Sequence, residues 1–251
     1  MGSKYIQSYT CDGFRDIDVK GKYLVVGTPC QIDSFRRYIR RIKREDNFVL
    51  MDFFCHGVPS MFLWKKYIGE IRNKGIRIDS VAWRNKKTGW HDSWAMTVNS
   101  KDENSEETHE RVFSRWTKGD YFYSMFLGNG CFGKACYKNC KFKDTKSAAD
   151  IRIGDFWGEQ YKTEDRGVNA VLAFSDRGDE LLNEINCTLR PHPVSDILSG
   201  QMAHSPKMPG EYNFTISLLR NPRLSLKAIM KIRKGIYYCK RIASILHLRH
   251  E

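Results

Sequence analysis

The chain has 251 residues, and 42 Lys and Arg against 29 Asp and Glu give it a formal net charge of +13. Apolar residues make up 41% of it, which fits a folded globular protein and excludes disorder over most of the chain. Its longest apolar runs, such as residues 48–51, fall far short of the ~18 residues that a membrane-spanning helix needs, so we expect no transmembrane segment. Because no apolar signal region follows Met1, we also expect a cytoplasmic protein.

Two strand–helix units are predicted near the start of the chain. Their strands lie at residues 23–27 and 48–54, and their helices, each with apolar side chains on one face, at residues 31–44 and 60–74. Units in this order place their strands in parallel, with both strand-to-helix loops on one edge of the sheet. Cys30 and Cys55 lie in these two loops. We therefore expect the two cysteines to share the edge at which open α/β sheets bind ligands.

The first of these helices has a clear start signal. Thr28 suits the N-cap position, and Pro29 suits the first helical position, where its missing N–H costs nothing. Gln31 is placed to complete a capping box by reaching back to the Thr28 amide. Cys30 is therefore expected in the first turn of a helix.

The middle of the chain changes to an alternating pattern that is typical of antiparallel strands. Strands are predicted at residues 81–84, 94–98 and 111–113, with a charged, solvated loop at residues 101–110 and a short aromatic helix at residues 120–127. Further strands are predicted at residues 150–154 and 170–174, and further helices at residues 178–186 and 224–248. The expected fold class is α/β: a mixed sheet with βαβ units, an inserted antiparallel β meander and a helical C-terminus.

Domain organisation follows from the same pattern. We expect one domain over residues 1–190 and a basic helical C-terminal extension over residues 191–251. Basic runs at residues 36–44 and 220–249 are most simply solvated helix faces. The alternative is contact with acidic partners, nucleic acid or a membrane surface.

The cysteines point to metal or redox chemistry, because eight cysteines in a cytoplasmic chain are not expected to form structural disulfides. Cys136 and Cys140 form a two-thiolate clamp, and Cys131 lies five residues upstream of it on a glycine-rich loop. Together with Cys30 and Cys55 on the sheet edge, the clamp would give four thiolates, which suits either a 4Fe-4S cluster or a tetrahedral zinc ion. The alternative for Cys30 and Cys55 is that they are simply small buried residues.

A few residues other than cysteines could take part in cofactor binding. Asp155 ends a predicted strand and either faces the crevice near Cys30 or acts as a turn former. Trp90 and Trp157, with Arg84 and Lys86, would suit a planar phosphorylated cofactor, or they are core aromatics beside a solvated basic face. The sequence indicates no catalytic residue.

Five segments, taken in order, resemble the coenzyme F-420 hydrogenase/dehydrogenase beta-subunit family, C-terminal domain. They are residues 27–32 (GTPCQI), 54–60 (FCHGVPS), 84–90 (RNKKTGW), 136–142 (CYKNCKF) and 147–158 (SAADIRIGDFWG). The resemblance runs from about Ser3 to Gly178 and leaves the basic C-terminus uncovered.

This resemblance implies a flavin enzyme that holds FAD beside a 4Fe-4S cluster and passes electrons between a carrier and a small-molecule acceptor. Relatives in many bacteria occur in surface-polysaccharide gene neighbourhoods, where the acceptor is not known. By motif position the cluster would be bound by Cys30, Cys55, Cys136 and Cys140. The flavin would lie near Lys4, Gln7, Ser8, Gly27, Thr28 and Asp155.

Two departures from the family pattern stand out. The family commonly has two residues between the paired cysteines and this chain has three, so Cys131 is an alternative to Cys136 or Cys140 as a ligand. Relatives often begin with a ferredoxin-type module that this sequence does not show, so we expect an N-terminally shortened member that depends on a ferredoxin or ferredoxin-like subunit. The competing hypothesis is a zinc-stabilised or vestigial binding module that contacts an acidic partner or nucleic acid.

Overall fold

The computed structural model describes residues 5–72, 76–87, 89–91, 94–102, 108–114, 119–138 and 140–247. The chain divides into two compact units, each assembled from separate stretches of sequence. The cysteine unit comprises Ser8–Gly57 and Ala135–Pro206, and the meander unit comprises Met1–Gln7, Val58–Lys134 and Lys207–Glu251. The expected boundary after residue 190 stays a prediction. Within the described ranges, no helix combines the length and apolar character that crossing a bilayer requires.

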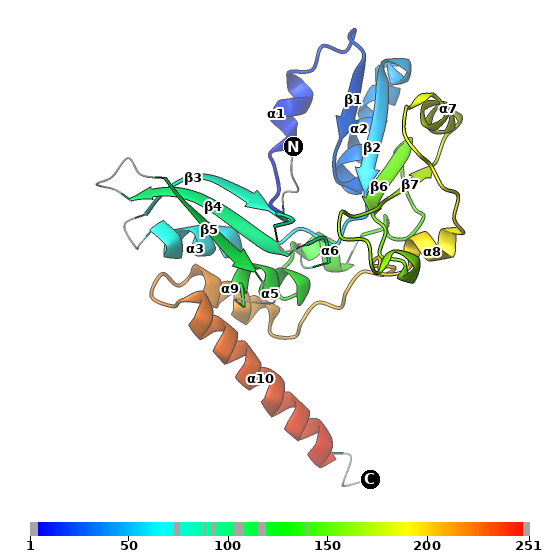
Figure 1. Cartoon of the computed structure of the whole chain (residues 1–251). Helices are drawn as coiled ribbons and strands as arrows, with labels where there is room; N and C mark the ends of the chain where they lie inside the picture. The colour runs from blue at the N-terminus through cyan, green and yellow to red at the C-terminus, as the bar shows by residue number, and fades with distance from the viewer. Residues whose placement is uncertain are drawn as a thin grey trace. The chain divides into compact units, whose positions relative to one another are not determined.

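A four-stranded mixed sheet forms the centre of the cysteine unit (Figure 1). Its strands, in spatial order, are β1 (Tyr23–Val26), β2 (Phe48–Phe53), β6 (Ile151–Asp155) and β7 (Asn169–Ala173). The first three run parallel and β7 runs antiparallel to β6. The predicted α/β class with a mixed sheet is therefore confirmed.

Helices surround this sheet: α1 (Thr10–Arg15), α2 (Pro29–Arg41), α6 (Lys134–Lys138), α7 (Asp176–Glu184) and α8 (Val194–Leu198). The core lies between α2 and β2, where Ile32, Phe35 and Ile39 of the helix are buried in one cluster with Phe48 and Leu50 of the strand. Burial at spacings of three and four residues is what the sequence predicted for this helix.

The capping box at the start of α2 is present as predicted. The Thr28 amide donates to Oε1 of Gln31 at 2.9 Å, and Pro29 occupies the first helical position. These contacts satisfy an N–H group that the helix itself leaves unpaired. They fix the point at which the chain leaves β1 and turns into α2, and so they fix the position of Cys30.

A buried ion pair ties the segment after the cysteine clamp to the sheet. Arg152 on β6 and Asp52 on β2 are both fully buried and form two hydrogen bonds of 2.7 Å. The same guanidinium donates to the carbonyl oxygens of Asp144 and Lys146, and the Ser147 hydroxyl donates to Asp52 at 2.7 Å. The segment just beyond Cys140 is therefore held to β2, the strand of Asp52, by a hydrogen-bond network in which both buried charges are paired.

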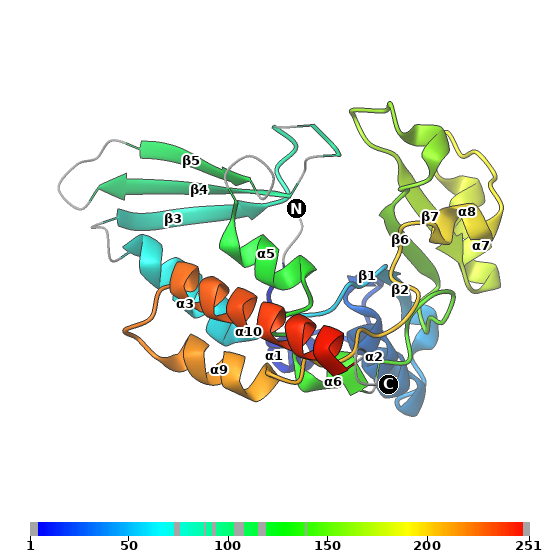
Figure 2. The same ribbon diagram turned by 90° about the horizontal axis from the view of Figure 1, so that it is seen from below.

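The meander unit contains a separate antiparallel sheet of β3 (Ile76–Trp83), β4 (Ala95–Asp102) and β5 (Thr108–Ser114). Figure 2 shows this sheet with the helices of the same unit beneath it. Those helices are α3 (Met61–Arg72), α5 (Tyr121–Leu127), α9 (Tyr212–Arg220) and α10 (Leu226–His247). The predicted meander is confirmed.

The predicted loop at residues 101–110 is wrong at both ends. β4 continues to Asp102 and β5 begins at Thr108, with Lys101 paired to Thr108 and Ser100 to His109. Residues 103–107 lie outside the described part of the chain. Polar residues continue these strands because main-chain pairing in a hairpin tolerates polar side chains on a solvent-facing side.

Candidate metal centre

Cys30 and Cys55 both follow strands that end at the same edge of the sheet. Cys30 is in the first turn of α2, directly after β1, and Cys55 lies two residues beyond the end of β2. The two strands pair in parallel, with Val26 opposite Met51. The predicted common edge is therefore confirmed.

Cys136 and Cys140 come from the second stretch of the cysteine unit, in α6 and just after it, and both are partly buried. Charge on Cys136 or Cys30 would act on the Cys55 thiol, so these three thiols are neighbours.

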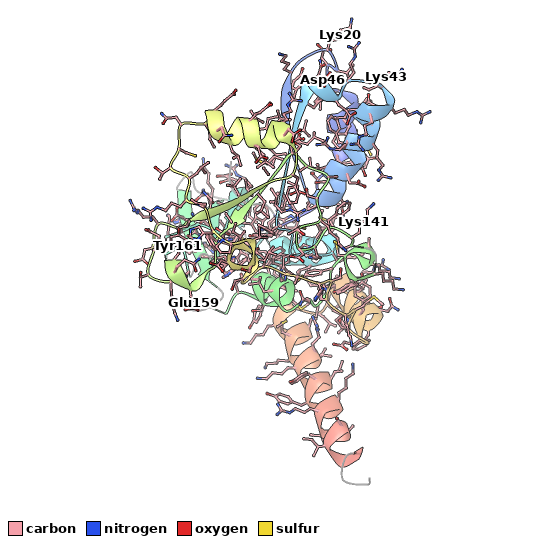
Figure 3. The ribbon with its side chains drawn as sticks, turned by 90° about the vertical axis from the view of Figure 1, so that its right-hand side faces the viewer. Lys20, Lys43, Asp46, Lys141, Glu159 and Tyr161 are labelled. Carbon is pink, nitrogen blue, oxygen red and sulfur yellow. The ribbon has the colours of Figure 1, made fainter. Side chains whose placement is uncertain are left out.

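Cys140 is connected to the same region through the residue after it. The Lys141 ammonium lies 3.8 Å from the carboxylate of Asp33, which sits three residues after Cys30 on α2. Figure 3 shows Lys141 beside this helix and Asp46, which precedes β2, at the opposite end of the unit. The Lys141 contact thus places the chain next to Cys140 beside α2, the helix that carries Cys30.

The Cys55 thiol is buried, which favours its neutral form. Burial raises the pKa of Cys55 to about 12, an effect that the Lys143 charge and the Gly57 amide partly oppose, while Cys136 and Cys30 add to it. A metal binding here would have to displace the proton of this thiol, since only the thiolate ligates.

A buried lysine beside these thiols was not predicted from the sequence. The Lys143 side chain is only 9% exposed; its ammonium donates to the carbonyl oxygens of Cys55 at 2.5 Å and His56 at 3.2 Å and lies 3.3 Å from the Met202 sulfur. Across the described residues, no carboxylate pairs with it.

An ammonium buried without a counter-charge is costly. Thiolates that hold a metal centre would supply the missing negative charge at this position. The donor set therefore fits a thiolate-bound centre in both its chemistry and its electrostatics. In the ranges that the structure covers, no three His, Cys, Asp or Glu side chains form a metal-binding group.

The predicted flavin contacts fall into three sets. Lys4 lies outside the described residues, and Gln7 belongs to the meander unit, while Ser8, Gly27, Thr28 and Asp155 belong to the cysteine unit. Within the cysteine unit, the Thr28 hydroxyl lies 3.2 Å from the Cys30 sulfur. Asp155 is the last residue of β6, which pairs in parallel with β2, so it ends at the same edge as Gly27 and Thr28.

Cys131 differs from these four cysteines in its setting. It belongs to the meander unit, is fully buried, and its carbonyl oxygen accepts from the Ser60 amide at 2.7 Å. Burial raises the pKa of Cys131 to about 12. These features are those of a core cysteine. Trp90 is likewise a fully buried core residue of that unit, which matches the core alternative for this aromatic.

The chain matches a known protein family over most of its length. A family model for the C terminus of the coenzyme F420 hydrogenase/dehydrogenase beta subunit matches residues 20–217. The chain belongs to this beta-subunit family. No curated protein matches the chain.

Membership in the beta-subunit family implies, in general terms, an oxidoreductase role for the chain. The matched span contains Cys30, Cys55, Cys136 and Cys140, and it begins after Lys4, Gln7 and Ser8. It also passes residue 190, includes α8 and ends within α9. The long helix α10 lies beyond the match.

Proposed function

We propose that the chain is an oxidoreductase that holds one 4Fe-4S cluster on Cys30, Cys55, Cys136 and Cys140, with FAD beside it. In this proposal it passes electrons between a ferredoxin or ferredoxin-like subunit and a small-molecule acceptor. The observation that carries the proposal is the buried Lys143 ammonium, which has main-chain and sulfur contacts beside the thiols but no carboxylate partner among the described residues.

Iron–sulfur chemistry is favoured over zinc by the family's redox role. Four thiolates can bind either a 4Fe-4S cluster or a zinc ion, and in both cases they would offset the charge of Lys143. Zinc, however, has no redox chemistry. The start of α2 also suits a negatively charged centre, because the positive end of the helix dipole lies at Cys30. A Cys30 ligand would therefore sit where negative charge is stabilised.

The flavin would occupy the same sheet edge. Gly27 and Thr28 precede α2 and Asp155 ends β6, and open α/β sheets bind nucleotide-like ligands at such positions. When bound, FAD would convert single electrons into pairs. In this proposal Thr28 lies between the flavin and the cluster, since its hydroxyl contacts the Cys30 sulfur.

The positive net charge of the chain would favour docking of an acidic electron carrier. A net charge of +13 favours association with acidic partners by electrostatic steering. The expected link to surface-polysaccharide biosynthesis concerns the acceptor and belongs to the same proposal.

The test is anaerobic purification followed by iron, sulfide, zinc and flavin analysis. We expect about four iron and four sulfide per chain, and loss of most of the iron in Cys140→Ser. Cys187→Ser removes an exposed cysteine and serves as the matched control. Retention of iron in Cys140→Ser with loss in Cys131→Ser would assign the ligand to Cys131 instead. Stoichiometric zinc without iron would overturn the proposal in favour of the zinc-stabilised binding module.

A further inference from the structure

The long helix α10 has one face that packs against its own unit. Leu226 and Ile229 on this face are buried, and Arg233 contacts the Met125 sulfur of α5 at 2.9 Å. About two turns further on, Lys240 forms an ion pair of 2.6 Å with Glu211, just before α9. Positions 226, 229, 233 and 240 recur at helical spacing, so together they define the inward face of the helix.

A second, apolar stripe lies on the opposite face of α10. It consists of Tyr238, Ile242 and Ile245, which are 48%, 57% and 47% exposed and recur at spacings of four and three residues. At 100° per residue they point about half a turn away from the inward face. Figure 1 shows this half of the helix extending past α5 and α9 of the same unit. The stripe is therefore not used by the unit's own core.

The charge of α10 is entirely of one sign. The helix carries six basic residues and no acidic residue between Leu226 and His247. Lys227, Lys231, Lys234 and Arg241 are exposed and lie on the side of the apolar stripe. The Lys234 ammonium lies 5.8 Å from the centre of the Tyr238 ring, so cationic and apolar groups adjoin each other directly.

We propose that this outward face of α10 binds an anionic lipid surface and lies in the headgroup plane. An exposed apolar stripe flanked by Lys and Arg is the pattern of interfacial helices, and tyrosines favour the level of the headgroups. A second copy of α10 is a poorer occupant, because pairing two helices with six cations and no acidic residue brings like charges together. This inference does not depend on the proposed cluster.

The experiment is cosedimentation of the full chain with vesicles. We expect binding to vesicles that contain phosphatidylglycerol and little binding to pure phosphatidylcholine, with the difference lost at high salt. Lys234→Gln/Arg241→Gln should weaken binding more than tenfold, since each basic residue near an anionic surface contributes about fivefold. Ile242→Ser/Ile245→Ser should weaken it about tenfold or more through lost apolar burial.

Matched controls come from exposed residues of the cysteine unit. Lys162→Gln/Arg166→Gln removes two exposed charges, and Ile185→Ser/Leu189→Ser removes two exposed apolar side chains; neither pair should change binding more than about twofold, because neither lies on α10. Circular dichroism checks that every variant is folded. Absence of binding to both vesicle types would overturn the proposal. So would control pairs that weaken binding as much as the α10 pairs. So would a dimer in sedimentation velocity that Ile242→Ser/Ile245→Ser converts to monomer, if the wild type does not bind vesicles.

Discussion

Replacing Lys143 by Met tests the electrostatic basis of the proposed cluster site. The ammonium donates to the Cys55 carbonyl at 2.5 Å, which places it roughly 5–7 Å from the sulfur of the same residue. At about 6 Å and an effective dielectric constant of about 20, one unit charge contributes about 3 kcal/mol. Because a one-electron reduction adds negative charge, removing the ammonium should lower the midpoint potential by on the order of 100 mV.

The measurement is a redox titration of the reconstituted protein followed by electron paramagnetic resonance. Lys143→Arg keeps the charge and should retain most of the potential. Lys141→Met is the matched control: this lysine is adjacent to Cys140 but 69% exposed, so solvent screening should limit its shift to about 30 mV or less. A potential for Lys143→Met within about 20 mV of the wild type would refute the reasoning, given the ~3 kcal/mol expected.

Three further outcomes concern the cysteine unit. Arg152→Met leaves Asp52 buried without its partner and should cost about 3–5 kcal/mol in urea unfolding; Asp52→Leu/Arg152→Met should recover most of this loss, and additive losses would contradict the pairing. Thr28→Ala should cost about 1 kcal/mol and Thr28→Ser much less, with equal losses counting against the cap. In the cluster-free protein, the stability contributed by the buried Cys55 thiol should be complete below pH 9 and be lost between pH 9 and 12, because the unfolded chain releases the Cys55 proton first. Cys131 acts in the same way, and the fall in this range should flatten in Cys55→Ala/Cys131→Ala.

The sequence is sufficient to predict the sheet edge because its signals there are local. Short runs of β-forming apolar residues mark β1 and β2, and helical apolar spacing marks α2. Thr28, Pro29 and Gln31 mark the turn between strand and helix. Parallel pairing then follows from connectivity alone. The positions of Cys30 and Cys55 at one edge needed no knowledge of long-range contacts.

Other features depend on contacts that single-sequence patterns do not show. The polar ends of β4 and β5 pair through main-chain hydrogen bonds, which leave no apolar signature. In the sequence Lys143 is one of many lysines, and only its burial against Cys55 and His56 makes it notable. The division into two interleaved units arises from contacts between distant stretches of the chain, and such contacts leave no local pattern in the sequence.

The cysteine unit is discontinuous, and this has a consequence for how the protein matures. Two of the proposed ligands come from Ser8–Gly57 and two from Ala135–Pro206, with residues 58–134 between them in sequence. If the four cysteines hold one cluster, its insertion must wait until the second stretch has been synthesised and has docked on β2 through the Asp52–Arg152 contact. Iron content would then report on correct assembly of the unit, and a substitution that weakens this docking would yield iron-poor protein without touching a ligand.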